Sequence, residues 1–266
     1  MTPQELLAHG DNGQCWPQAL SAKQGYDVPA AYQDALAVRA LRIARGEKPR
    51  GYKIGFTNRT IWPRYNVFGP IWGTVWDTTL TSSSSAHECS LLGLCQPRIE
   101  PEIVFGFKHT PKPDATLDDI YHSLEWMAPG FEVVQSHLPD WKFEVADTIA
   151  DGGLHGKLIV GEQTAVSAVA SSAQDLHALL AKASVALYRA ETQLEVGVGG
   201  HVLDSPLHAL AHFLKELRDC PGSTDIQAGD VVTTGTWTDA YPIESGQTWR
   251  ASFSLPRFSM SVNFED

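Results

Sequence analysis

Several features that would assign a class of function are absent from these 266 residues. No apolar run approaches the roughly 18 residues needed to cross a membrane, and the opening MTPQELLAHG lacks the basic and apolar stretches of a signal peptide. The chain has 31 acidic and 20 basic residues, a net charge of −11, and no Lys/Arg block suited to nucleic acid. We therefore expect a cytoplasmic protein with no membrane and no nucleic-acid partner. A site for an anion would need its own local positive charge.

Motifs for several kinds of catalysis are also absent. There is no GxSxG and no HExxH, and residues 197–200 lack the third glycine of a dinucleotide fingerprint. The four cysteines have no CxxC spacing, and we interpret them as packing residues in a reducing compartment. His208 and His212 have helical i, i+4 spacing, but leucines occupy the opposite stripe, so we expect both to face solvent.

Local patterns predict an α+β protein with a mixed sheet. Capping residues and apolar periodicity predict helices over residues 2–9, 30–44, 116–126, 172–183 and 206–217. Short apolar or alternating runs predict strands over residues 52–56, 99–107, 230–237 and 257–264. The serine-rich segment 79–90 is predicted to be a surface loop. We expect one core, with an N-terminal helical segment over residues 1–50 and a catalytic part over residues 51–266.

The most informative pair of residues is Glu100 and Glu102 in the segment IEPEIVF. Side chains two apart on a strand project to the same side, roughly 6 to 7 Å apart, so the two anions repel unless a cation lies between them. Pro101 lacks an N–H and suits an edge strand or a bulge beside a site. The alternative is an ordinary solvated polar face. Val104 shares the glutamate side, which indicates that this side is partly buried.

A third carboxylate, Glu132, is the only charge in the apolar segment GFEVVQS. Three carboxylates form a hard-donor set that suits Mg²⁺ or Mn²⁺, whereas zinc prefers His or Cys. Lys53 in GYKIGF shares its side of a strand with Gly55, which removes bulk beside the ammonium. Burial near a metal would lower the pKa of Lys53 and allow it to exchange protons. The alternative is a strand lysine whose ammonium reaches solvent.

Four ordered segments, over residues 51–57, 97–105, 131–151 and 228–236, resemble the hydratase and decarboxylase branch of the fumarylacetoacetate hydrolase superfamily. The resemblance covers about residues 30–264. It implies a mixed β-roll or distorted β-sandwich with peripheral helices. Members are commonly homo-oligomers, and a complex with a pathway decarboxylase or hydratase is a further expectation.

The resemblance also implies roles for individual residues. The metal ligands would be Glu100, Glu102 and Glu132, and the catalytic residues Lys53 and Asp77. The substrate-binding residues would be Asp147, Asp151, His155, Thr234 and Thr236. The Asn-Ala-Ser that usually follows the second aspartate is replaced here by Gly152-Gly153-Leu154-His155, which leaves substrate identity open.

The implied reaction is metal-dependent hydration of a 2-hydroxy-2,4-dienoate to a 4-hydroxy-2-oxo acid, in the meta-cleavage catabolism of aromatic compounds. The alternative is decarboxylation of a 2-oxo-3-enedioate such as 4-oxalocrotonate. An acylpyruvate hydrolase is disfavoured, because the lysine-asparagine-tyrosine segment of those enzymes is replaced by Lys53-Ile54-Gly55-Phe56. A silent partner subunit is disfavoured because the acidic set and the lysine are all retained.

Overall fold

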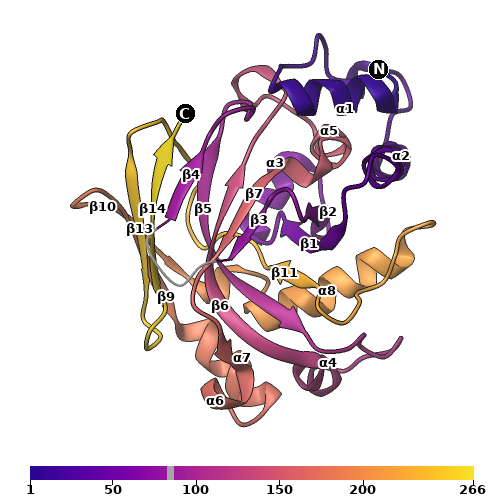
Figure 1. The fold of residues 1–266 in the computed structure, drawn as a ribbon. Coiled ribbons are helices and arrows are strands. Elements are labelled where there is room, and N and C mark those ends of the chain that lie inside the picture. Colours follow the sequence, from indigo (N-terminus) through magenta and orange to yellow (C-terminus); the bar gives the residue numbers. More distant parts are fainter. Residues whose placement is uncertain (83–86) are drawn as a thin grey trace.

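The computed structural model describes residues 1–82 and 87–266, except for the side chains of Arg64 and His87. Two β-sheets and peripheral helices form the fold (Figure 1). The larger sheet runs, in spatial order, β2 (Ile71–Trp76), β1 (Pro49–Gly55), β11 (Val231–Thr233), β5 (Arg98–Phe107), β6 (Leu124–Val134), β7 (His155–Val160) and β3 (Leu80–Ser82). Two short strands, β12 (Tyr241–Pro242) and β8 (Thr164–Ala165), pair with β5 and β6.

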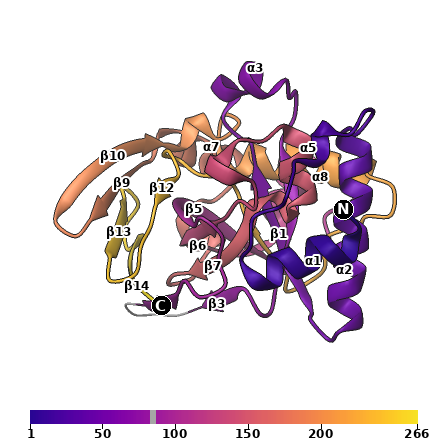
Figure 2. The same cartoon turned by 90° about the horizontal axis from the view of Figure 1, so that it is seen from above.

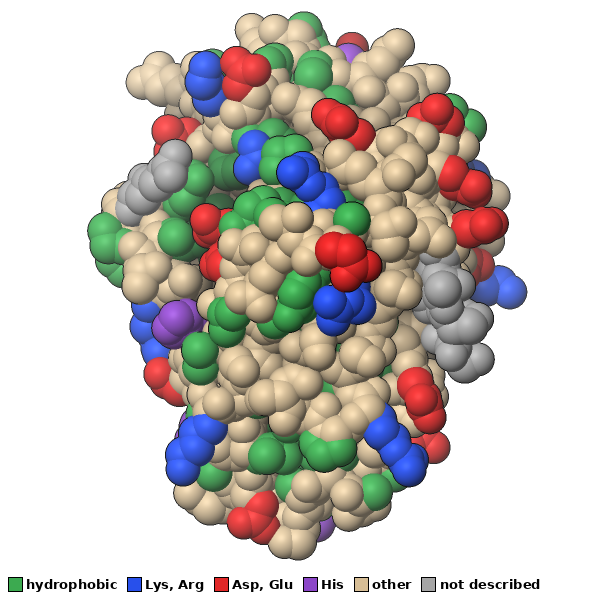
Figure 3. Space-filling view, turned by 90° about the vertical axis from the view of Figure 1, so that its left-hand side faces the viewer, with side chains coloured by type: hydrophobic (Ala, Val, Ile, Leu, Met, Phe, Trp, Pro, Cys, Tyr) green, Lys and Arg blue, Asp and Glu red, His purple; other side chains and the backbone are tan. Residues whose placement is uncertain are grey.

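The smaller sheet has five strands, in the order β10 (Thr192–Val198), β9 (Ser184–Arg189), β13 (Thr248–Phe253), β14 (Ser259–Glu265) and β4 (His87–Ser90). It lies on one side of the molecule, and the N-terminal helices lie on the other (Figure 2). On the face that carries this sheet, acidic and basic side chains are interspersed, with hydrophobic side chains between them (Figure 3).

The helices are peripheral. They are α1 (Pro3–Asn12), α2 (Val28–Ala44), α3 (Trp62–Tyr65), α4 (Leu117–Ser123), α5 (Val145–Ala150), α6 (Val166–Val169), α7 (Ala173–Lys182) and α8 (Pro206–Asp219). Local sequence sets their ends: Thr2 and Glu5 form a capping box on α1, and Asp27 caps α2. Among the described residues, no helix is both long and apolar enough to span a bilayer.

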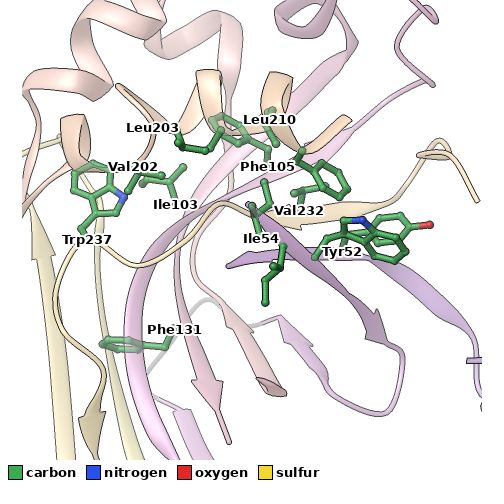
Figure 4. Close-up of a cluster of buried hydrophobic side chains, with 14 of the residues drawn as sticks. Tyr52, Ile54, Ile103, Phe105, Phe131, Val202, Leu203, Leu210, Val232 and Trp237 are labelled. Atoms are coloured by element: carbon green, nitrogen blue, oxygen red, sulfur yellow. The ribbon is translucent and has the colours of Figure 1, made fainter. Parts of the chain in front are cut away.

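The main hydrophobic core lies between the larger sheet, α8 and the smaller sheet. Ile103 and Phe105 of β5 lie near Leu203, which precedes α8, and Leu210, which is part of α8, as Figure 4 shows. The alternate residues of β5 point to the opposite face, where Val104 joins a second, smaller buried cluster. The β5 strand is therefore apolar on one face and carries its carboxylates on the other.

The α+β prediction is confirmed, and every predicted helix is present. The helix predicted over residues 116–126 is too long, because residues 124–126 begin β6. The strand predicted over 230–237 ends at Thr233, and the chain then turns towards the glutamates. The main core cluster includes Leu6 and Trp16 of the N-terminal segment, and the boundary at residue 50 remains a prediction.

Two further expectations are corrected. Segment 79–90 is not wholly a loop, since β3 pairs with β7 and β4 pairs with β14. Ser83, Ser84, Ser85 and Ala86 lie outside the described residues. The side chains of His208 and His212 are only partly exposed, and the ring of His208 packs edge-on against His177 at 4.4 Å.

Candidate metal centre

Strand register brings the three predicted carboxylates together. In the antiparallel β5–β6 pair, Glu100 lies directly opposite Glu132, and Glu102 lies opposite Gly130. One carboxylate oxygen from each glutamate can be chosen so that all three lie within 4.8 Å of one another. Glu102 and Glu132 are fully buried, and Glu100 is partly exposed. Among the described residues, this is the one group of three or more potential metal ligands found.

Among the described residues, only one of the two carboxylate oxygens of Glu102 has hydrogen-bond partners. Its Oε2 accepts hydrogen bonds from Thr233 Oγ1 and from the backbone N–H of Gly235, the latter at 2.6 Å. Its Oε1 is buried and has no hydrogen-bond partner within the described part of the chain. Gly235 has φ +98°, and a Cβ there would lie 2.1 Å from Thr57 Oγ1, so the turn requires glycine. A buried, unpartnered carboxylate oxygen among other carboxylates fits a cation ligand.

Lys53 lies on the same face and supplies the positive charge of the cluster. It is 3% exposed, and its Nζ lies 3.1 Å from Glu132 Oε2. A Cβ on Gly55 would lie 3.7 Å from Nζ, an ordinary contact distance, and its tightest neighbour would be the Ile71 side chain at 3.1 Å. The neighbouring Gly73 allows a close approach of the 152–154 turn, because a Cβ there would lie 1.9 Å from Gly152 O.

The charges of this cluster are unbalanced. Burial raises the pKa of Glu100 to about 7, against the opposing effect of Lys53. Burial, followed by repulsion from Glu132 and Glu100, raises the pKa of Glu102 well above its usual value. Burial alone lowers the pKa of Lys53, but attraction to the glutamates, Glu132 foremost, outweighs it and the pKa is raised. The lowered lysine pKa expected from the sequence refers to the metal-bound site and stays a prediction.

His155 touches the cluster from the side. Its Nδ1 lies 2.9 Å from Glu132 Oε1, and its Nε2 lies 2.8 Å from Thr79 Oγ1. Burial lowers the pKa of His155 despite the adjacent carboxylate, which favours the neutral ring. A neutral imidazole that donates from Nδ1 and accepts at Nε2 satisfies both contacts. In this geometry the residue orients Glu132.

Pro101 lies in a central strand, not at an edge, because β5 pairs with β6 on one side and with β11 and β12 on the other. The ladder to β11 ends at Val104, and the ladder to β12 begins at Ile99. Pro101 lies in this gap, where its carbonyl accepts from Trp237 N at 3.3 Å. An N–H at residue 101 would point into the same gap as the carbonyl, where no ladder partner lies, so the proline costs no ladder hydrogen bond.

The two predicted substrate-binding aspartates are occupied by structural contacts. Asp147 accepts from Ser21 N at 2.9 Å and from Ser21 Oγ at 2.6 Å, which ties α5 to the N-terminal segment. Asp151 accepts from His137 N at 2.9 Å, and His137 Nδ1 lies 2.6 Å from its other oxygen. Neither aspartate belongs to the carboxylate cluster.

Asp77 is not brought to the cluster. Gly73 of β2 pairs with Lys53, and Asp77 lies four residues further along, roughly 13 Å away at strand spacing. Its exposed side chain accepts a hydrogen bond from Lys48 N at 3.0 Å. The geometry gives this residue no part in proton transfer at Lys53.

The predicted threonines form backbone contacts. Thr234 Oγ1 donates to Ile103 O, and Thr236 Oγ1 donates to Thr238 O. The residue that binds a glutamate is Thr233, one position earlier, which the sequence prediction missed. Strand alternation in DVVTTGT offered a signal, since Thr233 pairs with Val104 and therefore shares the glutamate face.

Several known proteins are similar in sequence to this chain over most of its length. No family model matches the chain. Over 222 residues it is 32% identical to 2-hydroxyhexa-2,4-dienoate hydratase of Comamonas testosteroni, covering 82% of this chain and 80% of that relative. The chain belongs to the hydratase and decarboxylase branch of the fumarylacetoacetate hydrolase superfamily. This lyase is also 26% identical to a 4-oxalocrotonate decarboxylase of a Pseudomonas species, over 96% of this chain and 94% of that relative.

Solved structures confirm the expected fold. The lyase superposes on 4-oxalocrotonate decarboxylase from Pseudomonas putida G7, complexed with magnesium and adipate, with a TM-score of 0.84 and 24% identity, covering 99% of this chain and 98% of that one. Fumarylpyruvate hydrolase from Pseudomonas aeruginosa, in complex with Mn²⁺ and pyruvate, gives a TM-score of 0.61 at 13% identity, covering 81% of this chain and 89% of that one. The acidic cluster of the lyase fits a divalent metal.

Proposed function

We propose that this lyase hydrates a 2-hydroxy-2,4-dienoate to a 4-hydroxy-2-oxo acid in the catabolism of aromatic compounds. The observation that carries the proposal is the group of three glutamates with Lys53 on one sheet face. It occurs in a chain that is 32% identical to a dienoate hydratase. A 2-hydroxypent-2,4-dienoate hydratase of Pseudomonas putida, 32% identical over 73% of this chain, supports the same substrate class.

Glu100, Glu102 and Glu132 would hold Mg²⁺ or Mn²⁺, because all three donors are carboxylate oxygens. When bound, the ion would supply a Lewis acid that stabilises negative charge on the 2-oxo oxygen of the substrate. Thr233 and Gly235 keep Glu102 oriented through hydrogen bonds to its Oε2, which leaves Oε1 for the ion.

Lys53 would move the proton. With the glutamate charges shared by a cation, the attraction that raises the pKa of Lys53 weakens and its burial lowers that pKa. The ammonium could then give a proton to substrate carbon and the amine take one from substrate oxygen, which is the tautomerisation that precedes addition of water. His155 would fix Glu132 during this exchange.

Decarboxylation of a 2-oxo-3-enedioate is the second candidate. It is favoured by the 4-oxalocrotonate decarboxylase relative, which aligns with 96% of this chain, including most of the N-terminal segment. The same electron-withdrawing site would serve both reactions, because each requires negative charge to accumulate on the 2-oxo group.

One experiment separates the two reactions. The Mg²⁺-loaded enzyme is incubated with 2-hydroxypenta-2,4-dienoate and, separately, with 4-oxalocrotonate, and the products are followed by NMR together with CO₂ release. We expect 4-hydroxy-2-oxopentanoate from the dienoate. Release of CO₂ from 4-oxalocrotonate without hydration of the dienoate would instead identify a decarboxylase. A metal-stripped sample and a Glu102→Gln sample serve as blanks.

We also propose a cytoplasmic homo-oligomer, as is common in this branch, that associates with a decarboxylase or hydratase of the same pathway. Light scattering of the purified lyase would measure the subunit number. A monomer at micromolar concentration would refute the oligomer.

A further inference from the structure

Arg98 extends the glutamate face of β5 by one more charged side chain. It lies two residues before Glu100, so both side chains project to the same side of the strand, roughly 6 to 7 Å apart. Its guanidinium lies 4.3 Å from the centroid of the Trp141 ring. Within the described part of the chain, that guanidinium forms no ion pair and donates no hydrogen bond. The cation is therefore held in place by an aromatic ring, with its donors uncommitted.

Trp141 belongs to a row of four aromatic rings. Its ring centroid lies 6.1 Å from that of Phe143, which lies 5.8 Å from Tyr65, which in turn lies 5.0 Å from Phe56. Phe56 directly follows β1, the strand that carries Lys53. This aromatic row thus links the end of the lysine strand to the start of the glutamate strand, and α3, which carries Tyr65, projects from the body of the molecule (Figure 2).

The net charge of the metal-bound site shows why a further positive charge would be needed. Three ionised glutamates, one protonated lysine and one divalent ion sum to zero, so that group gives no net attraction to a second carboxylate on a substrate. The chain as a whole is also strongly acidic, at −11. Arg98 adds the positive charge that the far end of a doubly anionic substrate would require.

We propose that Arg98 is a specificity-determining residue that binds the distal carboxylate of a 2-oxo dicarboxylic acid. The 2-oxo acid end of that substrate would lie at the divalent ion that Glu100, Glu102 and Glu132 would hold. The inference rests on the proposed function and narrows its substrate class to enedioates over alkyl-ended dienoates. A guanidinium stacked on a ring keeps its N–H edge open, which suits bidentate binding of a carboxylate. The aromatic row supplies an apolar wall for the unsaturated carbon chain between the two ends.

Two unreactive ligands of equal length test the assignment. 2-Oxoadipate ends in a carboxylate and 2-oxohexanoate in a methyl group, and calorimetry on the Mg²⁺-loaded enzyme gives a Kd for each. We expect 2-oxoadipate to bind about tenfold more tightly. Arg98→Met should reduce that ratio to about one, and Arg98→Lys, which keeps the charge but loses the planar fork, should give an intermediate ratio. Arg250→Met, which removes an arginine stacked at 3.8 Å on Tyr188 in the other sheet, should keep the wild-type ratio.

The ratio of the two Kd values separates specific binding of the distal carboxylate from a structural role of Arg98. A general loosening of the site would weaken the binding of both ligands and leave the ratio unchanged. Equal Kd values in the wild type, or a tenfold ratio that survives Arg98→Met, would refute the role of Arg98 and leave the proposed function intact. Failure of both ligands to bind the Mg²⁺-loaded wild type would refute the proposed function itself. If Arg98→Met does not fold, the ratio in Arg98→Lys decides, with a full wild-type ratio counting against the assignment.

Discussion

Two groups of buried acids in this lyase differ in how their oxygens are satisfied. Asp147 receives hydrogen bonds on both oxygens, two of them from Ser21, and both oxygens of Asp151 contact His137. In the carboxylate cluster, by contrast, Glu102 Oε1 has no partner among the described residues. The protein thus supplies a partner to both oxygens of each aspartate but leaves Glu102 Oε1 without one in the described part of the chain.

The comparison separates acids that hold the fold together from acids that await a ligand. A buried carboxylate with a complete set of donors stabilises the elements that supply those donors. Burial, together with repulsion from neighbouring carboxylates, raises the pKa of Glu100 and of Glu102, and such a group is costly to ionise until a cation binds. Among these acids, burial alone therefore does not distinguish the site, whereas a buried oxygen without a hydrogen-bond partner does.

The largest expected effect comes from Glu102→Gln. The variant removes one ligand charge, so we expect Mg²⁺ binding to fall below detection by calorimetry and turnover to fall by about 10³-fold or more. Glu125→Gln, at an exposed glutamate of β6, is the matched control. Metal binding by the Glu102→Gln protein with wild-type affinity would show that the cluster is not the metal centre.

Asp147→Asn tests the other half of the comparison. An amide cannot accept on both sides, so the backbone N–H of Ser21 or that of Glu144 loses its acceptor, and the free energy of unfolding should fall by about 1–3 kcal/mol, measured by urea denaturation of the metal-free protein. The Mg²⁺ affinity should not change. Asp140→Asn, at an exposed position, provides the baseline. A loss of metal affinity without a loss of stability would place Asp147 in the site after all.

Thr233→Val should weaken Mg²⁺ binding by about tenfold, because Glu102 loses one of the two donors that orient it. Thr234→Val is the matched control, since that hydroxyl donates to the Ile103 carbonyl and touches no glutamate. Equal affinities in the two variants would mean that the backbone N–H of Gly235 is sufficient to fix the carboxylate.

The parts of the site that could be predicted from sequence depend on short-range geometry. Glu100 and Glu102 share a side because side chains alternate along any strand, whatever its neighbours. The capping box of Thr2 and Glu5 is likewise complete within four residues. Glu132 and Lys53 were candidates as charged residues in apolar strand-like segments, and the family resemblance supported their assignment to the same site, because nothing local relates β6 or β1 to β5.

The parts that sequence reasoning missed depend on long-range register. Thr233 reaches Glu102 only because β11 pairs with β5 in one register. Asp77 was assigned from the family resemblance, and the register of β1 with β2 places it far along the paired strand from Lys53. The raised pKa of Lys53 arises from the summed charge of three glutamates on two other strands, which the local segment GYKIGF does not contain.

The smallest expected effect is the pH dependence of stability without metal. The pKa of Glu100 is raised from its usual 4.5 to about 7, so the folded protein binds this proton more tightly than the unfolded chain does. The resulting stability is complete below about pH 4.5 and is lost as pH rises through about 7, where a buried anion forms. The melting temperature of the metal-free lyase should therefore fall between about pH 5 and pH 8.

Saturating Mg²⁺ should reverse that trend, because metal binding requires the ionised carboxylates and grows stronger as their protons leave. In Glu100→Gln the fall in melting temperature should be shallower, since one of the shifted groups is gone, while Glu125→Gln should follow the wild type. A metal-free melting temperature that rises over this range would mean that the protein already satisfies the ionised carboxylates of the cluster, as donors satisfy the oxygens of Asp147 and Asp151, and the contrast between the two groups of acids would disappear.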